Sequence, residues 1–373
     1  MKTWPVFGIL VIQVILLLAH WFLFHTWIEF WDTPSAVAVL ALRIVLLVLA
    51  FSFVIAALLS FNYANWLVKI IYKFAATWLG LLNYLFIAAC VTWIAWYVWA
   101  MAKISAVPSG ARPWIAGTLG AVAIATGGFG ILNARVIRTR KISVTLPGLP
   151  ESWRGRRAVL MSDLHLGHVN GEGFGRRVVA MANALKPDVV FIPGDLFDGT
   201  EADLDQLLTP FNQLDAPFGV FFTTGNHEEF GGVAEKIRAV TRAGMRVLQS
   251  EKVTIDGLHI AGVPWGDSLS PIRLKAVLDK MQFDPNEASI LLNHMPSRLP
   301  IVERAGVSLQ LSGHTHGGQL FPFTWITRRV FGEFTYGLHR FGALQVYTSY
   351  GAGTWGPPMR VETYPEIVLI EFS

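Results

Sequence analysis

The chain has 373 residues, enough for roughly two or three domains. Hydrophobic residues make up 53% and charged residues 15%, a composition that is too apolar for an ordinary soluble protein and indicates contact with lipid. The net charge of +4 divides unevenly, because residues 1–150 carry +8 and the remainder carries −4. The only cysteine, Cys90, excludes an intrachain disulfide, and its apolar neighbours predict a packing role for the thiol.

Four stretches in the N-terminal part are long and apolar enough to cross a membrane, for which a helix needs about 20 residues. They are Thr3–Ile28, Ser35–Phe61, Phe74–Ala102 and Pro113–Ala134. None has a polar face to meet water, which disfavours the alternative of a buried soluble bundle. The first stretch is longer than the apolar part of a signal peptide, and no small-residue cleavage site follows it, so we expect it to be retained. The sequence therefore predicts a transmembrane domain of four helices over residues 1–140.

Basic residues gather on one side of these predicted spans. That side has Lys2, Lys69, Lys73, Arg135, Arg138, Arg140 and Lys141. The other side has Glu29, Asp32, Lys103 and Arg112. Because positively charged segments stay in the cytoplasm, we expect a multi-pass protein of the inner (cytoplasmic) membrane with its C-terminal domain on the cytoplasmic side.

From Ala158 onward, short apolar runs alternate with helical stretches, which predicts an α/β domain over residues 141–373. The expected strands are Ala158–Met161, Val189–Pro193, Gly219–Thr223, Ser289–Leu292 and Val307–Leu311. The expected helices between them include Gly175–Leu185, Ala202–Gln213 and Val233–Ala243.

Each of the five expected strands is followed by side chains that bind divalent metals. Ligands of α/β sheets bind beyond the carboxyl ends of the strands, so these groups are expected to converge. Asp, Asn and His suit hard or borderline divalent cations, and glycines stand at the turns. Any one of these motifs is weak evidence, but the five in this order predict a metal centre. The residues are Asp163, His165, Asp195, Asp198, Asn226, His227, His294, His314 and His316.

The series Asp163-x-His165, Gly194-Asp195-x-x-Asp198, Gly225-Asn226-His227-Glu228, His294 and Gly313-His314-x-His316 resembles the calcineurin-like metallophosphoesterase family, over about residues 157–372. The longer forms Ser162–Gly167, Ser312–Gln319 and Gly351–Arg360 are most similar to its branch of membrane-associated bacterial phosphoesterases. The resemblance implies two β-sheets sandwiched between helices. The fold class expected for the whole chain is thus an α-helical transmembrane bundle followed by an α/β catalytic domain.

The resemblance also implies two sets of metal ligands. One metal would be held by Asp163, His165, Asp195 and His316, and the other by Asp195, Asn226, His294 and His314. Asp195 would bridge two cations, which need anionic charge between them when they lie about 3.5–4 Å apart. The mixed oxygen and nitrogen ligands suit Mn²⁺, Fe or Zn²⁺ better than Ca²⁺. The two cations are expected to acidify a bridging water, whose hydroxide attacks phosphorus.

His227 is not a metal ligand by this resemblance. We expect it to donate a proton to the leaving oxygen or to stabilise charge on the phosphate. Asp198 is expected to orient His227 or a metal ligand, with a turn-capping carboxylate as the alternative. His168 has two readings, as a contact to substrate phosphate or as a solvated loop residue.

The segment Leu320–Tyr336 mixes aromatic residues with arginines. This composition is typical of a loop that dips into lipid headgroups, and a covered core loop is the alternative. His339 and Arg340 follow the segment, and the sequence assigns neither a role.

The predicted function is that of a metal-dependent phosphoric ester hydrolase that cleaves a phosphodiester or pyrophosphate bond. A lipid-linked substrate is favoured because the catalytic domain directly follows a basic membrane exit. A membrane scaffold or sensor with a non-catalytic centre is disfavoured, because the expected ligands and His227 are all present. A nucleotide or nucleic-acid phosphodiesterase is also disfavoured, because the catalytic half has a net charge of −4 and we expect no nucleic-acid partner.

Overall fold

The computed structural model describes residues 4–102 and 111–373. Thr3 of the first expected span and Lys2 and Lys103 of the charge pattern lie outside the described residues. The chain divides into two compact units. One comprises Met1–Leu132 with Gly356–Met359, and the other comprises Asn133–Trp355 with Arg360–Ser373. The chain divides after Leu132, and the boundary expected from the sequence lies a little later, at residue 140.

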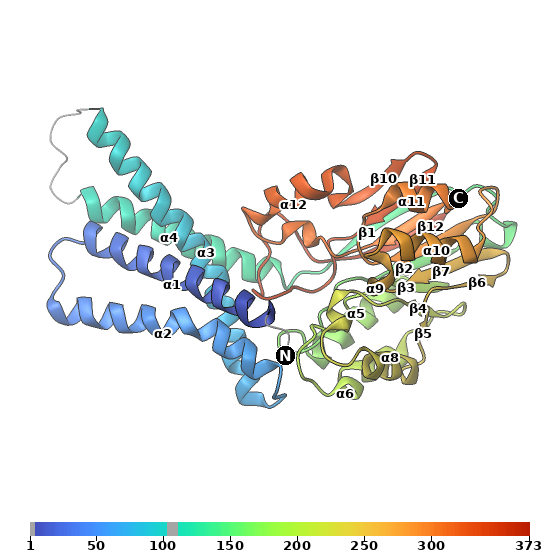
Figure 1. Ribbon diagram of the computed structural model, residues 1–373, viewed down its shortest axis with the longest axis horizontal. Helices are drawn as coiled ribbons and strands as arrows, with labels where there is room; N and C mark the ends of the chain where they lie inside the picture. The colour runs from blue at the N-terminus through green and yellow to red at the C-terminus, as the bar shows by residue number, and fades with distance from the viewer. Residues whose placement is uncertain (1–3, 103–110) are drawn as a thin grey trace. The chain divides into compact units, whose positions relative to one another are not determined.

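Within the described residues, the first unit contains four long helices, which confirms the expected number of apolar helices (Figure 1). They are α1 (Trp4–Phe30), α2 (Ala36–Ser60), α3 (Trp66–Met101) and α4 (Ala111–Asn133). Each is long and apolar enough to cross a membrane. Helix α3 starts earlier than expected because the Asn65 side chain caps it, accepting a hydrogen bond from the Val68 amide at 3.0 Å.

Polar side chains inside the first unit pair across helices. The indole of Trp78 in α3 donates to His20 Nε2 in α1 at 2.9 Å, and the indole of Trp93 donates to Thr26 Oγ1 at 2.9 Å. Because hydrocarbon offers no partner to a polar group, such pairs hold apolar helices together. These contacts link α1 to α3 along its length.

The second unit is built on two six-stranded sheets. The first has the order β1 (Arg138–Val144), β12 (Glu366–Phe372), β2 (Arg157–Leu160), β3 (Val189–Ile192), β4 (Val220–Phe222) and β5 (Arg246–Val247). The second has the order β10 (Gly337–Phe341), β11 (Leu344–Thr348), β9 (Leu309–Ser312), β8 (Ser289–Asn293), β7 (Leu258–Val263) and β6 (Glu251–Ile255). Strands β2 to β5 are parallel to one another, as are β7, β8, β9 and β11.

Three hydrophobic clusters arrange these sheets into layers. Side chains of both sheets, such as Phe191 and Ile290, meet in one buried cluster, so the sheets pack face to face. The outer face of the first sheet packs on helices α5 (Glu172–Ala184), α6 (Leu204–Leu208) and α8 (Val233–Arg242). The outer face of the second packs on α10 (Pro271–Met281) and α11 (Leu299–Arg304). This confirms the expected pair of sheets sandwiched between helices.

Two expected elements have a different form. The single helix expected over Ala202–Gln213 ends as α6 at Leu208 and continues as a 3-10 turn, Thr209–Gln213, because Pro210 has no amide hydrogen for a continuing α-helix. The expected loop within Leu320–Tyr336 contains a helix, α12 (Phe323–Phe331). Further short helices are α7 (Asn226–Glu229) and α9 (Trp265–Ser268), with 3-10 turns at Glu151–Trp153, His316–Gly318 and Gly332–Thr335.

Candidate metal centre

The residues expected to bind metal lie together in the second unit, at the carboxyl ends of five strands. The first sheet contributes the segments after β2, β3 and β4, and the second contributes those after β8 and β9. Since parallel strands direct their carboxyl ends to one edge, the two packed sheets bring both sets of segments to one place. Three overlapping groups of side chains have ligand atoms within 4.8 Å of one another. They are Asp163, His165 and His316; His165, Asp195 and His227; and Asp195, His294 and His314.

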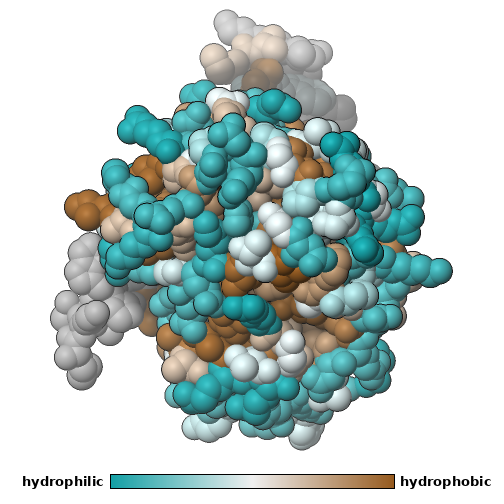
Figure 2. All heavy atoms as spheres, turned by 90° about the vertical axis from the view of Figure 1, so that its right-hand side faces the viewer, coloured by the Kyte–Doolittle hydropathy of each residue, from teal (hydrophilic) through white to brown (hydrophobic). Residues whose placement is uncertain are grey.

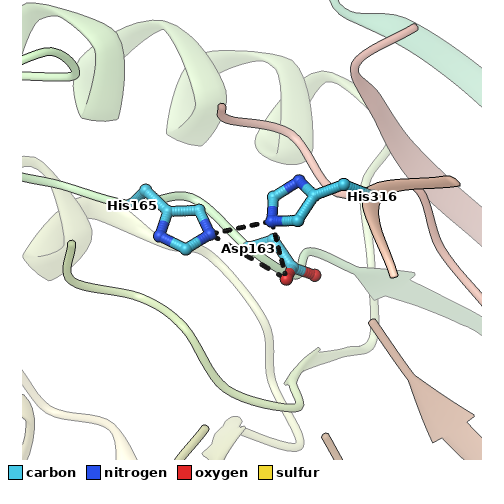
Figure 3. A group of neighbouring side chains, drawn as sticks. All are labelled: Asp163, His165 and His316. Atoms are coloured by element: carbon cyan, nitrogen blue, oxygen red, sulfur yellow. Dashed lines mark hydrogen bonds and ion pairs between the residues drawn. The ribbon is translucent and has the colours of Figure 1, made fainter. Parts of the chain in front are cut away.

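The first group is drawn in Figure 3, where Asp163, His165 and His316 point toward one another. His165 Nε2 lies 3.0 Å from His316 Nε2, and His316 Nε2 lies 3.4 Å from Asp163 Oδ1. His165 Nε2 is also 3.8 Å from Asp195 Oδ2, which connects this group to the others. Two imidazole nitrogens this close can share only one hydrogen, so at least one of them carries a lone pair.

The second side of the centre contains His294, whose two ring nitrogens have separate tasks. Nδ1 donates to the Pro193 carbonyl at 2.9 Å, which orients the ring. Nε2 lies 3.1 Å from Asp195 Oδ2. His314 Nδ1 lies 3.0 Å from Asn226 Oδ1, so the amide oxygen joins the same side. Imidazole, carboxylate and amide atoms that face one another in this way are a donor set that fits divalent cations.

Five of these residues hold left-handed backbone conformations that ordinary residues rarely adopt. Such residues cost about 1–3 kcal/mol each and gather at functional sites. Positive φ angles are found at Asp163 (52°), His165 (47°), Asp195 (52°), His314 (69°) and His316 (47°). The strain falls on the motif residues and so supports a functional reason for their conformation.

Two glycines permit the close approach of the motif loops. A Cβ on Gly313 would lie 2.0 Å from Asp163 Oδ2 and from Ser162 Oγ, and one on Gly225 would lie 2.2 Å from Asp195 Oδ1. Any larger residue would push these carboxylates out of place. The motif glycines therefore determine where Asp163 and Asp195 lie.

The charges of the carboxylates and of His294 are strongly coupled. Burial raises the pKa of Asp163 to about 6, with the neighbouring Asp195 adding to the effect. Burial alone would also raise the pKa of Asp195, but His294, by charge and hydrogen bond, holds it well below its usual range. Asp195 in turn outweighs the effect of burial on His294 and raises the pKa of its imidazole to about 9. Without metal at neutral pH, the proton therefore resides on His294 and the negative charge on Asp195.

Three further histidines of the expected ligand sets, His165, His314 and His316, are neutral at physiological pH. Burial, with the nearby His294, lowers the pKa of His314 to about 3. Burial also holds the pKa values of His165 and His316 well below the usual value. Neutral imidazoles offer the lone pairs that metals bind, so the site is preorganised for cations.

His227 lies at the edge of the centre, and its ring is oriented by backbone. Its Nδ1 donates to the Asp198 carbonyl at 2.7 Å, which leaves Nε2 for other partners. Its ring centroid is 4.6 Å from that of His165. The Asp198 carboxylate accepts from the amides of His168 and Thr200 and from the Thr200 hydroxyl. Asp198 thus reaches His227 through its peptide oxygen, and its carboxylate shapes the turn.

His168 is buried, and its Nδ1 is paired with Thr200 Oγ1 at 2.9 Å. His339 Nε2 donates to the Tyr336 carbonyl at 2.9 Å, while Arg340 is exposed on β10. The structure thus gives His168 and His339 hydrogen-bond partners within their own neighbourhoods.

Two buried charged residues organise the centre without an expected role. Glu228 accepts hydrogen bonds from the amides of Asp195 (2.9 Å), Phe197 (3.0 Å) and Gly225 (2.7 Å), which ties the β3 loop to the β4 loop. Arg360 is fully buried and donates to the carbonyls of His316 (3.2 Å), Tyr350 (2.6 Å) and Gly353 (2.7 Å). Glu228 ends the motif Gly225–Glu228, and Arg360 ends the segment Gly351–Arg360. Their place in these motifs is the sequence feature from which a role at the centre could be predicted.

Aromatic rings form the rim beside His227. Phe230 and Trp355 make edge contacts with its ring, at centroid distances of 5.0 Å and 5.8 Å. Both side chains are exposed, Phe230 by 46% and Trp355 by 58%. The rim therefore combines a titratable side chain with accessible apolar surface.

Comparisons with known proteins identify relatives of this chain. The sequence profile of the calcineurin-like phosphoesterase family matches residues 156–318. An uncharacterized metallophosphoesterase of Aquifex aeolicus is 33% identical over 257 residues, which cover 67% of this chain and 97% of that protein. An uncharacterized metallophosphoesterase of Campylobacter jejuni is 33% identical over 240 residues, covering 63% of each chain.

A third relative, named a transmembrane protein with metallophosphoesterase domain, comes from Danio rerio. It is 34% identical over 262 residues, which cover 65% of this chain and 59% of that protein. The match thus spans about three fifths of the length of the Campylobacter and Danio proteins.

Proposed function

The chain belongs to the calcineurin-like metallophosphoesterase family, and we propose that it is a membrane-anchored hydrolase that cleaves a phosphodiester or pyrophosphate bond in a lipid-linked substrate. The observation that carries the proposal is the position of Asp195, whose Oδ2 lies 3.8 Å from His165 Nε2 and 3.1 Å from His294 Nε2, one residue of each proposed ligand set. A carboxylate shared between groups is suited to bridge two cations.

We propose that Asp163, His165, Asp195 and His316 hold one divalent cation, and that Asp195, Asn226, His294 and His314 hold a second. Their mixed oxygen and nitrogen atoms favour Mn²⁺, Fe or Zn²⁺. Such cations, when bound, attract phosphate oxygens and lower the pKa of water so that hydroxide forms near neutral pH.

His227 is the proposed proton donor to the leaving oxygen. Its Nδ1 hydrogen is committed to the Asp198 carbonyl, so Nε2 can donate only when the ring is an imidazolium. In that form the ring also places a positive charge beside the substrate phosphate. The role therefore requires the charged ring at the start of the step and the neutral ring after it.

The lipid-linked substrate is supported by two features. The four apolar helices keep the enzyme in a membrane, where a lipid substrate is concentrated. The exposed rings of Phe230 and Trp355 beside His227 offer apolar contact to the group that leaves. A water-soluble substrate would gain little from either feature.

The test is a comparison of substrates with full-length protein in detergent and Mn²⁺. We expect hydrolysis of dispersed lipid pyrophosphates or lipid phosphodiesters at a higher kcat/KM than of a soluble bis-aryl phosphodiester. Asp195→Ala should remove bound metal and activity together, as metal analysis of the same samples would record. Hydrolysis of the soluble diester without hydrolysis of any lipid substrate would overturn the lipid assignment. Retained activity of Asp195→Ala would overturn the metal assignment.

The proposed location is the inner membrane, with the catalytic unit in the cytoplasm. The dense basic cluster between Arg135 and Lys141, next to α4, supports this orientation. A C-terminal fusion to a reporter that works only in the periplasm should be inactive, and an active fusion would reverse the orientation.

A further inference from the structure

Helix α12 presents an apolar side to solvent. Trp325 is 60% exposed, Ile326 45% and Val330 67%, and Phe323 is also exposed. Positions 323, 326 and 330 follow the three- and four-residue spacing that places side chains on one side of a helix. Thr324, on the other side, is buried. The helix is therefore amphipathic with its apolar side outward, the reverse of an ordinary surface helix.

This arrangement differs from the face of the molecule that Figure 2 shows. The face of the molecule in Figure 2 is largely hydrophilic, with smaller hydrophobic areas between polar side chains. Single exposed apolar residues are normal on protein surfaces, but a continuous group of large ones indicates a binding surface. The exposed side of α12 is such a group.

The inner side of the helix and the turn that follows it make contacts near the metal centre. The Thr315 hydroxyl, between the two histidines of the fifth motif, donates to the Thr335 carbonyl at 2.8 Å. The ring of Phe331 makes an edge contact with His314 at a centroid distance of 6.3 Å. The Thr324 hydroxyl donates to Glu362. These contacts fix the inner side of α12, so its outer apolar side is available to a partner.

The charge of α12 indicates the chemistry of that partner. The helix carries Arg328 and Arg329 and no acidic residue. The Arg329 guanidinium lies 5.6 Å from the centroid of the Trp325 ring. Two acidic residues nearby, Glu333 and Glu362, contact His339 (3.6 Å) and Thr324 respectively. Arginine and tryptophan beside aliphatic side chains are typical of helices that lie in the headgroup layer of anionic membranes.

We propose that α12 lies in the headgroup layer of an anionic bilayer, with Phe323, Ile326 and Val330 directed toward the acyl chains and Arg329 on lipid phosphates. Only four residues separate the end of α4 from the start of β1, a link of at most about 14 Å. The second unit is thus tethered to whatever membrane α4 crosses, and a bilayer is always within its reach. The proposal does not rest on the hydrolytic function, since it concerns only where α12 lies.

The experiment measures the depth of α12 directly in the full chain. In a Cys90→Ala background, single cysteines replace Ile326 or Val330 and carry a nitroxide spin label. The matched control is Ile272 in α10, an isoleucine that is 82% exposed in the same unit. The protein is placed in nanodiscs of phosphatidylcholine and phosphatidylglycerol, and collisions of the label with oxygen and with a water-soluble Ni²⁺ complex are compared. Metal-dependent hydrolysis of a soluble diester verifies the fold of each variant.

We expect labels at positions 326 and 330 to collide mainly with oxygen, at a depth of about 5–10 Å, and the label at 272 to collide mainly with Ni²⁺. In a chain labelled at position 330, Ile326→Glu should return the label to water while soluble-diester hydrolysis stays unchanged. Labels at 326 and 330 as open to Ni²⁺ as the label at 272 would overturn the proposal. Spin–spin broadening that disappears on dilution with unlabelled protein would show that α12 contacts a second copy of the chain instead of the bilayer. That result would also overturn the proposal.

Discussion

Arg360→Lys tests whether the metal centre depends on a single buried guanidinium. Arg360 donates to the carbonyls of three buried residues, His316, Tyr350 and Gly353. Burial lowers the pKa of Arg360 to about 10, so the side chain stays charged at neutral pH. Lysine keeps the charge, but its single compact ammonium cannot reproduce the planar fork that reaches all three carbonyls.

The expected cost follows from these contacts. A hydrogen bond from a charged group contributes about 1.5–3 kcal/mol, and Lys should lose at least one such bond and weaken another. We expect the free energy of unfolding to fall by about 3 kcal/mol, which corresponds to a fall in Tm of roughly 6–12 °C for a unit of this size. Because His316 is one of the carbonyl partners, the metal content of the purified protein should fall as well.

The assay is thermal unfolding of full-length protein in detergent, combined with metal analysis. The control is Arg242→Lys, since Arg242 lies on the surface and pairs with Asp205 at 2.6 Å. A surface pair of this kind contributes about 0.2–1 kcal/mol, so the control should unfold close to the wild type. A Tm of Arg360→Lys equal to that of Arg242→Lys, together with an unchanged metal content, would refute the role of the guanidinium in holding the His316 loop.

Two substitutions and one binding measurement test the centre further. His227→Asn should lower kcat by about 10²–10⁴-fold while the metal content stays at the wild-type value, because a proton donor is lost and no ligand is; loss of metal would make His227 a ligand instead. Gly313→Ala should abolish metal-dependent activity, because its Cβ would lie 2.0 Å from Asp163 Oδ2, whereas Gly173→Ala, with no atom within 4 Å of its Cβ, should be active. Binding of Mn²⁺ at pH 7 should release a proton from His294, whose pKa is about 9 without metal, so the apparent affinity should rise about tenfold per pH unit up to that value. Titration calorimetry in buffers of different ionisation enthalpy measures this release, and heats that do not depend on the buffer would contradict it.

The sequence predicted the layered fold because its signals are local. An apolar run that ends in a glycine-flanked polar motif indicates both a buried strand and the point where that strand stops, and strands β2, β3, β4, β8 and β9 lie within a few residues of the predicted ranges. The four apolar helices are predicted for the same reason, since a span is read from its own composition. Strands such as β5 and β10 carry no such signal, because β5 has two residues and β10 is only partly buried.

Side-chain pairing across long sequence separations could not be predicted. Arg360 reaches His316 over 44 positions, and nothing near either residue specifies that contact. Asp198 shows the same limit, because its motif indicates a carboxylate near His227 but not that the peptide oxygen makes the hydrogen bond. Helix α12 is different, because it can be predicted from the sequence. Ile326 and Val330 are four residues apart, a helical spacing, although the aromatic residues and arginines of the segment favour a loop.

The left-handed conformations at the centre explain why the motifs combine ligands with glycines and buried charges. Residues such as Asp163 and His316 hold an unfavourable backbone only because neighbouring groups require it. The His314 amide donates to Asp163 at 3.0 Å, and Arg360 holds the His316 carbonyl. The same hydrogen bonds that maintain the strained loops therefore direct the carboxylates and imidazoles inward before any cation arrives. Preorganisation of the ligands and strain in the backbone are thus two consequences of one hydrogen-bond network, and a substitution that relaxes the strain is expected to weaken the binding of metal.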